Sequence, residues 1–165
     1  MRQLIIFFAI VCLAALSPLA SSASESKISS IPQNCASIKI SLQNLQKIDS
    51  RTRVYLGTEY ENILNNFMTP LNLRLIKNHQ DASSLTSIQA SFSSEKEFLS
   101  RSFVDYSKSL DELIAHDCTS DPSGFYSLLE RTREKRAAVR SSFLRLNDEI
   151  ERHRAAVSNL KKDSP

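Results

Sequence analysis

The longest regular pattern in the chain runs from Phe125 to Leu160, FYSLLERTREKRAAVRSSFLRLNDEIERHRAAVSNL. Apolar residues return every three or four positions, and no Gly or Pro interrupts the run. From Thr132 onward the spacing alternates between four and three, which is a heptad seam typical of a long amphipathic helix that packs along other helices. The seam consists of Phe125, Leu128, Leu129, Thr132, Arg136, Val139, Phe143, Leu146, Ile150, His153, Val157 and Leu160.

The composition indicates one all-α domain. The chain has 165 residues, which is enough for a single domain, and it contains only two Gly, no Trp and no strand-like alternation that could find a partner strand. Its 21 Lys and Arg are balanced by 18 Asp and Glu, for a net charge of +3. Mixed charge of this kind is typical of a solvated surface, so we expect no nucleic-acid partner.

The N-terminus has the features of a secretory signal peptide. Arg2 supplies a positive charge, residues 4–16 form an apolar run, and small residues follow at Ser21 and Ala23. These features predict a signal peptide over residues 1–23 with cleavage after Ala23. An uncleaved N-terminal anchor is the alternative, although the run is shorter than the roughly 20 residues of a membrane-spanning helix. We therefore expect a secreted, periplasmic or cell-envelope protein.

Two cysteines remain once that segment is removed, Cys35 and Cys118. An even number of cysteines in an exported chain indicates a disulfide. The alternatives are two free thiols or a metal site.

The next part of the chain predicts a flexible leader over residues 24–31 and a helical domain over residues 32–161. The first helix is expected to start near Pro32 to Cys35. Because Pro70 cannot continue the backbone hydrogen bonds, we expect that helix to be kinked or broken there, with Thr69 capping a new turn. Its apolar stripe is Ile38, Leu42, Leu45, Ile48, Tyr55, Leu56, Tyr60, Ile63, Leu64 and Phe67, followed by Leu71, Leu75 and Ile76, and it is weakened at Asp49, Thr52 and Gly57.

Two further helices are predicted. One follows the turn at residues 81–84, and the other starts at Asp121 and Pro122, an N-cap followed by a first-turn proline. A polar, disordered tail is expected over residues 162–165. The stripe of the second helix is Leu85, Ile88, Phe92, Glu95, Leu99, Phe103, Tyr106, Leu110 and Leu113.

Three long helices joined by short turns predict an antiparallel, up-down-up three-helix bundle with coiled-coil-like packing. Cys35 lies at the start of the first helix and Cys118 just after the end of the second. These two ends are adjacent in an antiparallel pair, so the topology and the expected disulfide are mutually consistent.

The layout of the chain resembles a known group of proteins. Cys35 opens the first helix, Tyr55 and Leu56 lie along it, Asp81 and Leu85 open the second, and Cys118 precedes Phe125, Leu128, Arg131, Arg133 and Val139. This order resembles the small exported, one-disulfide helical proteins of ultrasmall candidate-phylum bacteria of the Saccharibacteria type. Many proteins of that kind carry an additional membrane-spanning segment, and this sequence has no second apolar run. The resemblance implies a secreted or cell-envelope setting and no particular chemistry.

Catalytic motifs are absent from the sequence. No serine lies in a Gly-x-Ser-x-Gly turn, and Gly57 and Gly124 are the only glycines, too few for a phosphate-binding loop. His79, His116 and His153 are not spaced as metal ligands, and a disulfide would withdraw Cys118 from any site with His116. We expect His116 to interact with a helix C-terminus and His153 to be a polar residue of the seam. The prediction is a protein that is not an enzyme and holds no cofactor or metal.

A basic cluster and two aromatic residues are the remaining candidates for binding. The cluster could bind an anionic partner, such as lipid headgroups, wall polymers or an acidic protein surface, or it could be a solvated face with Arg136 paired to Glu61 or Asp105. Phe98 and Tyr126 lie beside their stripes and would form an adhesive patch if they cluster. The basic cluster is Arg131, Arg133, Lys135, Arg136, Arg140 and Arg145.

These observations predict a non-enzymatic, exported binding or structural protein of the cell envelope or extracellular space. One alternative is a periplasmic holdase-type chaperone, which would carry a groove lined with exposed apolar residues. Another is an anion-binding surface module that uses the basic cluster. A protein or cell-envelope partner is expected, and peripheral membrane contact and self-association are open.

Overall fold

The computed structural model describes residues 20–162, and all regular structure in that range is helical. The elements are α2 (Ala20–Asn62), the π-helix η2 (Ile63–Met68), α3 (Thr69–Lys77), α4 (Ser83–Ala115) and α5 (Pro122–Lys162). The prediction of an all-α helical bundle is therefore confirmed. Residues 1–19 of the predicted signal peptide and residues 163–165 of the predicted tail lie outside the described residues.

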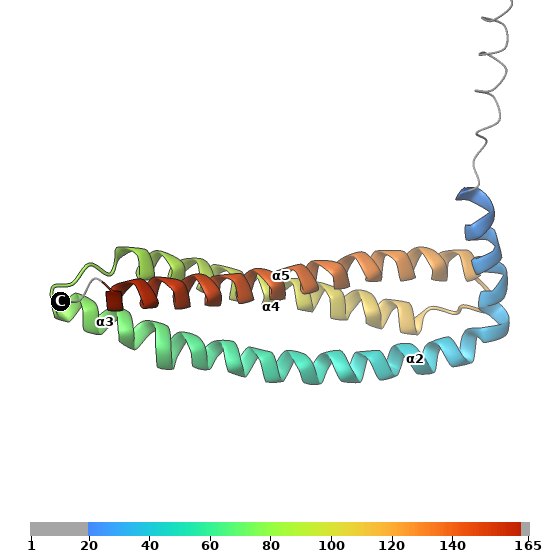
Figure 1. Ribbon diagram of the computed structural model, residues 1–165. Helices are drawn as coiled ribbons and strands as arrows, with labels where there is room; N and C mark the ends of the chain where they lie inside the picture. Colours follow the sequence, from blue (N-terminus) through green and yellow to red (C-terminus); the bar gives the residue numbers. More distant parts are fainter. Residues whose placement is uncertain (1–19, 163–165) are drawn as a thin grey trace, which may run out of the picture.

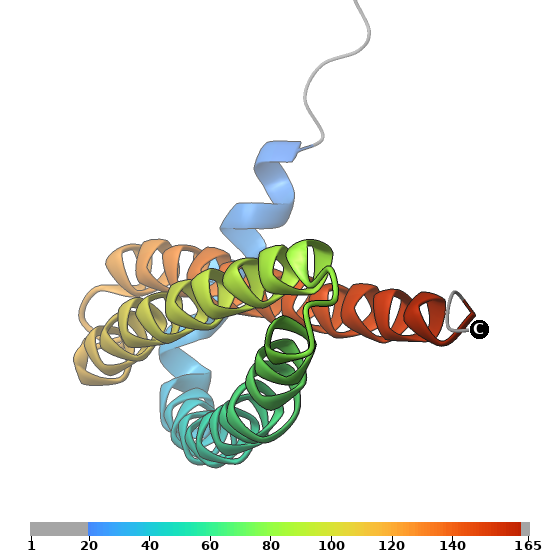
Figure 2. The same ribbon diagram turned by 90° about the vertical axis from the view of Figure 1, so that its left-hand side faces the viewer.

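The chain forms three long helical stretches that lie side by side (Figure 1). The colours in Figure 1 run from right to left along α2 and α3, from left to right along α4, and from right to left again along α5. Short connections at residues 78–82 and 116–121 join them. Figure 2, a view along the bundle, shows α4 and α5 together and the α2–α3 stretch on one side of them.

The first helix begins earlier than the sequence predicts. Residues 24–31 are helical, so the expected flexible leader is wrong, and Pro32 lies inside α2. Asn34 also lies inside the helix, where its Nδ2 donates a hydrogen bond of 2.9 Å to the Ser30 carbonyl. A proline inside a helix removes one backbone hydrogen bond and bends the axis. Figure 1 shows the first turns of α2, in blue, directed away from the rest of that helix.

α4 and α5 form the main packing unit of the bundle. Of the nine residues in the predicted α4 stripe, all but Glu95 are buried, and Arg136 is the one exposed residue of the predicted α5 seam. A buried polar contact sets the register, since the Thr132 and Ser109 hydroxyls lie 2.8 Å apart. Asp121 caps α5 as predicted, because its Oδ1 accepts a hydrogen bond of 2.9 Å from the Gly124 N–H.

α2 does not pack continuously against this unit, although Ile31, Leu42 and Tyr60 are buried in the core. Ile48, Tyr55 and Phe67 belong to the predicted stripe but are 60%, 65% and 66% exposed, so their prediction as core residues is wrong. From residue 50 to residue 59, only Leu56 is even partly buried. Figure 1 shows α2 curving away from α4 and α5 along the middle of its length.

The helical path continues through Pro70 without a break. Residues 63–68 form a π-helix, in which the Thr69 N–H donates to the Leu64 carbonyl five residues earlier. Thr69 has helical dihedral angles, so its prediction as the cap of a new helix is wrong, and Pro70 lies in the first turn of α3. A π-helical turn is a recognised way to fit an irregular residue into a helix. A kink of the axis at Pro70 stays a prediction.

The disulfide between Cys35 and Cys118 is present, as predicted. Their Cα atoms lie 5.7 Å apart across a sequence separation of 83 residues. Cys118 is fully buried in the core, and Cys35 packs against the same cluster. The bond therefore fastens the N-terminal half of α2 to the connection between α4 and α5.

Reduction of this disulfide is expected to lower the free energy of unfolding by about 2–5 kcal/mol, because the unfolded chain regains the entropy of a long open loop. Urea denaturation followed by circular dichroism, with and without reductant, measures the change. A variant carrying Cys35→Ser and Cys118→Ala is the control and should not respond to reductant. An unfolding midpoint of the native chain that is equally insensitive to reductant would contradict the prediction.

Candidate functional site

A polar cluster joins the three long helices near the middle of the bundle. Arg136 of α5 donates two hydrogen bonds to Asp49 of α2, from Nε to Oδ2 at 2.9 Å and from a terminal nitrogen to Oδ1 at 3.0 Å. The Tyr106 hydroxyl of α4 donates to the same Oδ2 at 2.7 Å. Two parallel bonds of this kind orient a guanidinium and a carboxylate strongly.

The environment of this cluster stabilises its present protonation states. Burial, followed by the adjacent Asp49 carboxylate, raises the pKa of Tyr106, so the phenol stays protonated and continues to donate. The hydrogen bonds to Asp49 raise the pKa of Arg136. The guanidinium is 51% exposed and the carboxylate 16% exposed, so solvent screens the ion pair from one side.

The sequence predicted the kind of partner for Arg136 but not its identity. A carboxylate from another helix does pair with it, yet that residue is Asp49 and neither Glu61 nor Asp105. Glu61 instead pairs with Lys96 of α4. A signal was present in the sequence, because Asp49 and Arg136 both interrupt apolar stripes with opposite charges. Glu95 likewise interrupts the α4 stripe, and it accepts a bond of 2.8 Å from Arg145, which lies beside the α5 seam.

Most of the predicted basic cluster is engaged within the chain. Besides Arg136 and Arg145, Arg131 pairs with Glu112 at 2.7 Å, and Arg133 pairs with Glu130 on its own helix. Lys135 and Arg140 have no ion pair or hydrogen bond among the described residues. The structure therefore does not present six free cations on one surface.

Two cavities flank the middle of α2. The first has a volume of 420 Å³, lies between α2 and α5, and includes Thr52, Arg133 and Arg140 in its lining. The second has a volume of 670 Å³, lies between α2 and α4, and includes Gly57 and Lys96. Both volumes are in the range of small-molecule sites.

Phe103 of α4 and Phe143 of α5 line both cavities. The Arg53 guanidinium of α2 lies 5.1 Å from the centre of the Phe103 ring, and Leu56 of α2 packs against the core. We call the two cavities together the α2 gap. Gly57 lies along it, and a Cβ atom added there would meet nothing within 4 Å. The gap was not predicted, although the weak part of the first stripe, at Asp49, Thr52 and Gly57, is its α2 wall.

The α2 gap is closed at both ends by contacts of α2. The Asp49 cluster lies at one end. At the other, the buried Tyr60 ring packs 5.9 Å from Phe92 and 6.3 Å from Phe143, and its hydroxyl lies 3.4 Å from Asn147 Oδ1. The unpacked segment between these contacts corresponds to about 16 Å of helix.

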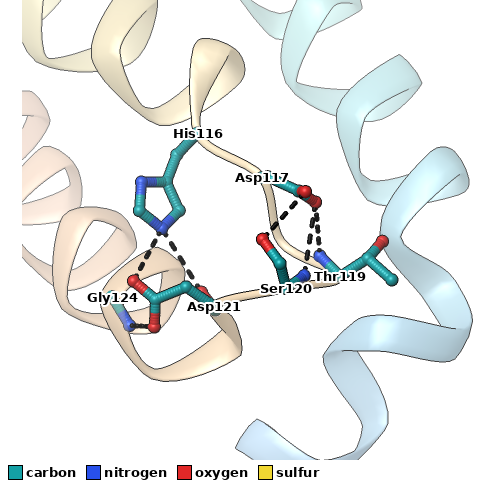
Figure 3. Close-up of polar contacts among 6 residues, drawn as sticks. All are labelled: His116, Asp117, Thr119, Ser120, Asp121 and Gly124. Carbon is teal, nitrogen blue, oxygen red and sulfur yellow. Dashed lines mark hydrogen bonds and ion pairs between the residues drawn. The ribbon is translucent and has the colours of Figure 1, made fainter.

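His116 and its neighbours form a structural loop. The His116 Nε2 lies 3.1 Å from Asp121 Oδ2, and Asp117 accepts hydrogen bonds from the Thr119 N–H and the Ser120 hydroxyl (Figure 3). His116 is the C-cap residue of α4, at the helix C-terminus where the sequence placed it, and its side chain also contacts the cap of the next helix. Among the described residues, no group of three His, Cys, Asp or Glu side chains could hold a metal ion.

His153 is partly buried in the seam, where the sequence placed it. Burial lowers its pKa, and its Nε2 atom has no hydrogen-bond partner in the structure. It lines a further cavity of 590 Å³ beside Phe67, Met68 and Pro70. An unpartnered ring nitrogen alone assigns no chemistry to this cavity.

Phe98 and Tyr126 do not form one patch. The Phe98 ring lies 5.2 Å from the Arg145 guanidinium, whereas Tyr126 packs against the core near the start of α5. Residues 126 and 145 are separated by about 28 Å along an ideal helix. The adhesive patch that these two residues could have formed together is therefore absent.

No protein-family model, curated protein or solved structure matches this chain. The resemblance to Saccharibacteria-type exported proteins stays a prediction. No helix within residues 20–162 is long and apolar enough to cross a membrane. The disulfide is compatible with an oxidising compartment.

Asp49→Ala is expected to lower the free energy of unfolding by about 1–3 kcal/mol, because it leaves the buried Tyr106 hydroxyl without its acceptor. Denaturant unfolding measures the loss. Asp105→Ala is the matched control, since Asp105 is exposed and has no partner among the described residues, and it should change stability by less than about 0.5 kcal/mol.

Tyr106→Phe combined with Asp49→Ala tests the origin of that loss. Removing the hydroxyl as well should recover part of the stability, since no buried donor is then left unpaired. Equal stabilities of the Asp49→Ala and Asp105→Ala variants would contradict the role assigned to the cluster.

Proposed function

We propose that this chain is a non-enzymatic, exported binding protein of the cell envelope or extracellular space, and that it binds a small apolar ligand in the α2 gap. The proposed architecture is a disulfide-stapled, antiparallel, up-down-up three-helix bundle with coiled-coil-like packing. The colour order along the helices in Figure 1 and the position of the disulfide support that topology.

The observation that carries the proposal is the unpacked middle of α2. Ten consecutive residues of a long helix, from 50 to 59, have one partly buried member, yet the helix is fastened on both sides of them. Beneath them lies a floor that includes two aromatic rings, Phe103 and Phe143. A concave, mainly apolar space with a few polar groups at its edges is the usual form of a small-molecule site.

N-Phenyl-1-naphthylamine, a neutral apolar fluorophore, is a direct probe of the α2 gap. We expect saturable binding to the native chain and a loss of affinity of at least about tenfold in Gly57→Leu. The added side chain enters the second cavity at a position where a Cβ meets no other atom, so the fold should tolerate it. Fluorescence titration measures the affinity, and circular dichroism checks the fold.

Ser50→Leu is the matched control, because it adds the same side chain to an exposed position of α2 outside both cavities. It should bind the fluorophore like the native chain. Absence of saturable binding to the native chain, or equal binding by Gly57→Leu, would overturn the proposed site.

A holdase-type chaperone is the second candidate function. Large apolar residues on α2 and η2 are exposed, as such a protein requires: Ile40, Ile48, Val54, Tyr55 and Phe67. These five side chains do not share any of the cavities described above, whereas the α2 gap is a defined concave space, and this candidate therefore comes second. It would be favoured if the chain suppressed aggregation of reduced insulin and Gly57→Leu did so equally well.

An anion-binding surface module is less well supported. Four of the six residues in the basic cluster already pair with carboxylates. Peripheral membrane contact and self-association have no specific contact in the structure to support them.

The intact mass of the exported chain tests the proposed localisation. Cleavage of the signal peptide after Ala23 would give a chain that starts at Ser24, with both remaining thiols protected from alkylation until reductant is added. Mass spectrometry with and without reductant reads both properties in one experiment. A full-length mass with freely alkylated Cys35 and Cys118 would contradict export and the disulfide together.

A further inference from the structure

We infer that the ligand of the α2 gap is a single-chain anionic amphiphile, a fatty carboxylate, whose acid group binds Arg140 at the α5 side while its apolar chain extends beneath α2. This inference rests on the proposed function and specifies the ligand of the same site. It follows from the different charges of the two cavities, from the free guanidinium of Arg140 and from the shared aromatic floor.

The cavity between α2 and α5 is positively charged. Three guanidinium groups line it, those of Arg133, Arg136 and Arg140, against the single carboxylate of Asp49. The cavity between α2 and α4 is balanced, because its charged lining residues are Arg53 and Lys96 against Glu61 and Glu97. The net positive charge of its lining therefore favours an anionic group at the α5 side.

Arg140 is the guanidinium available to such a group. Arg136 is held by Asp49 through two hydrogen bonds, and Arg133 pairs with Glu130. Arg140 is exposed, lines the cavity and has no ion pair or hydrogen bond among the described residues. A guanidinium with its donors unoccupied can bind a carboxylate in a bidentate manner.

The two aromatic residues that line both cavities determine where the alkyl chain of the amphiphile can extend. Phe143 lies on α5 three residues after Arg140, and Phe103 lies opposite on α4; both rings line both cavities. An alkyl chain whose acid group is at Arg140 therefore extends along Phe143 and beside the Arg53 guanidinium, which lies 5.1 Å from the centre of the Phe103 ring, toward the side of Gly57. Because this path lies between helices, a single alkyl chain can enter it, whereas the flat surface of a bilayer cannot.

Displacement of N-phenyl-1-naphthylamine by three amphiphiles with the same dodecyl chain tests the inference. The anionic probe is dodecanoate, the neutral probe is dodecyl maltoside and the cationic probe is dodecyltrimethylammonium, each below its micellar concentration. We expect dodecanoate to displace the fluorophore from the native chain at about tenfold lower concentration than dodecyltrimethylammonium. The difference should shrink as salt is added, because the Arg140 side is exposed to solvent.

Arg140→Gln should remove most of the preference for dodecanoate over dodecyltrimethylammonium, measured as the ratio of the two displacing concentrations in that variant. Lys135→Gln is the matched control, since it removes one charge from the same helix at a residue that has no partner among the described residues and lies outside the cavity lining. This control should keep the full preference.

The outcomes separate this inference from the proposed function. If the fluorophore binds but all three amphiphiles displace it equally, or if Arg140→Gln keeps the preference for dodecanoate, the fatty carboxylate is wrong as the ligand. The proposed binding site in the α2 gap would then still be supported. No fluorophore binding at all would overturn both. A membrane-binding surface is the other possible use of this positive charge. It would be indicated if the chain bound phosphatidylglycerol vesicles, if Arg140→Gln and Lys135→Gln weakened that binding equally, and if dodecanoate did not displace the fluorophore preferentially. This result would also overturn the inference.

Discussion

The packing of α4 against α5 is the constraint on which the rest of the structure depends. Their apolar stripes face each other along nearly their whole length, and a connection of six residues, 116–121, joins them. The contact between the Ser109 and Thr132 hydroxyls and the ion pair between Glu95 and Arg145 fix one register of the two helices. These two helices thus provide a rigid surface to which the first helical stretch is fastened.

α2 is fastened to that surface at separate points instead of along a continuous stripe. A covalent bond holds it at Cys35, a bidentate ion pair with a buried phenol holds it at Asp49, and aromatic packing holds it at Tyr60. Between Asp49 and Tyr60, the residues that face the bundle are small or polar, with Leu56 as the exception. The Arg53 guanidinium lies 5.1 Å from the centre of the Phe103 ring and Leu56 packs against the core, but the other side chains leave space beside them, and the two cavities remain there.

Charged residues on otherwise apolar stripes both hold the helices in register and shape the proposed binding site. Asp49, Glu95 and Arg136 each interrupt a stripe, and each pairs with an opposite charge on another helix, Glu95 with Arg145. Such pairs add little stability when solvent reaches them, but they restrict which helix faces can meet. In the first cavity they also bring guanidinium groups beside an aromatic floor, which is the combination that recognises an acid with an apolar chain.

The sequence by itself determined the helical class, the stripes of α4 and α5, the cap at Asp121 and the disulfide, because periodicity, capping residues and the number of cysteines are local or compositional properties. The sequence could not determine which residues of α2, η2 and α3 are buried: Ile48, Tyr55 and Phe67 have the spacing of core residues and are exposed, while Ile31 and Asn72, outside that stripe, are buried. Periodicity shows which face of a helix is apolar but not whether another helix lies within reach of it. The partner of Arg136 and the α2 gap therefore emerged only from the tertiary structure, since both depend on the path of the α2 axis relative to α4 and α5.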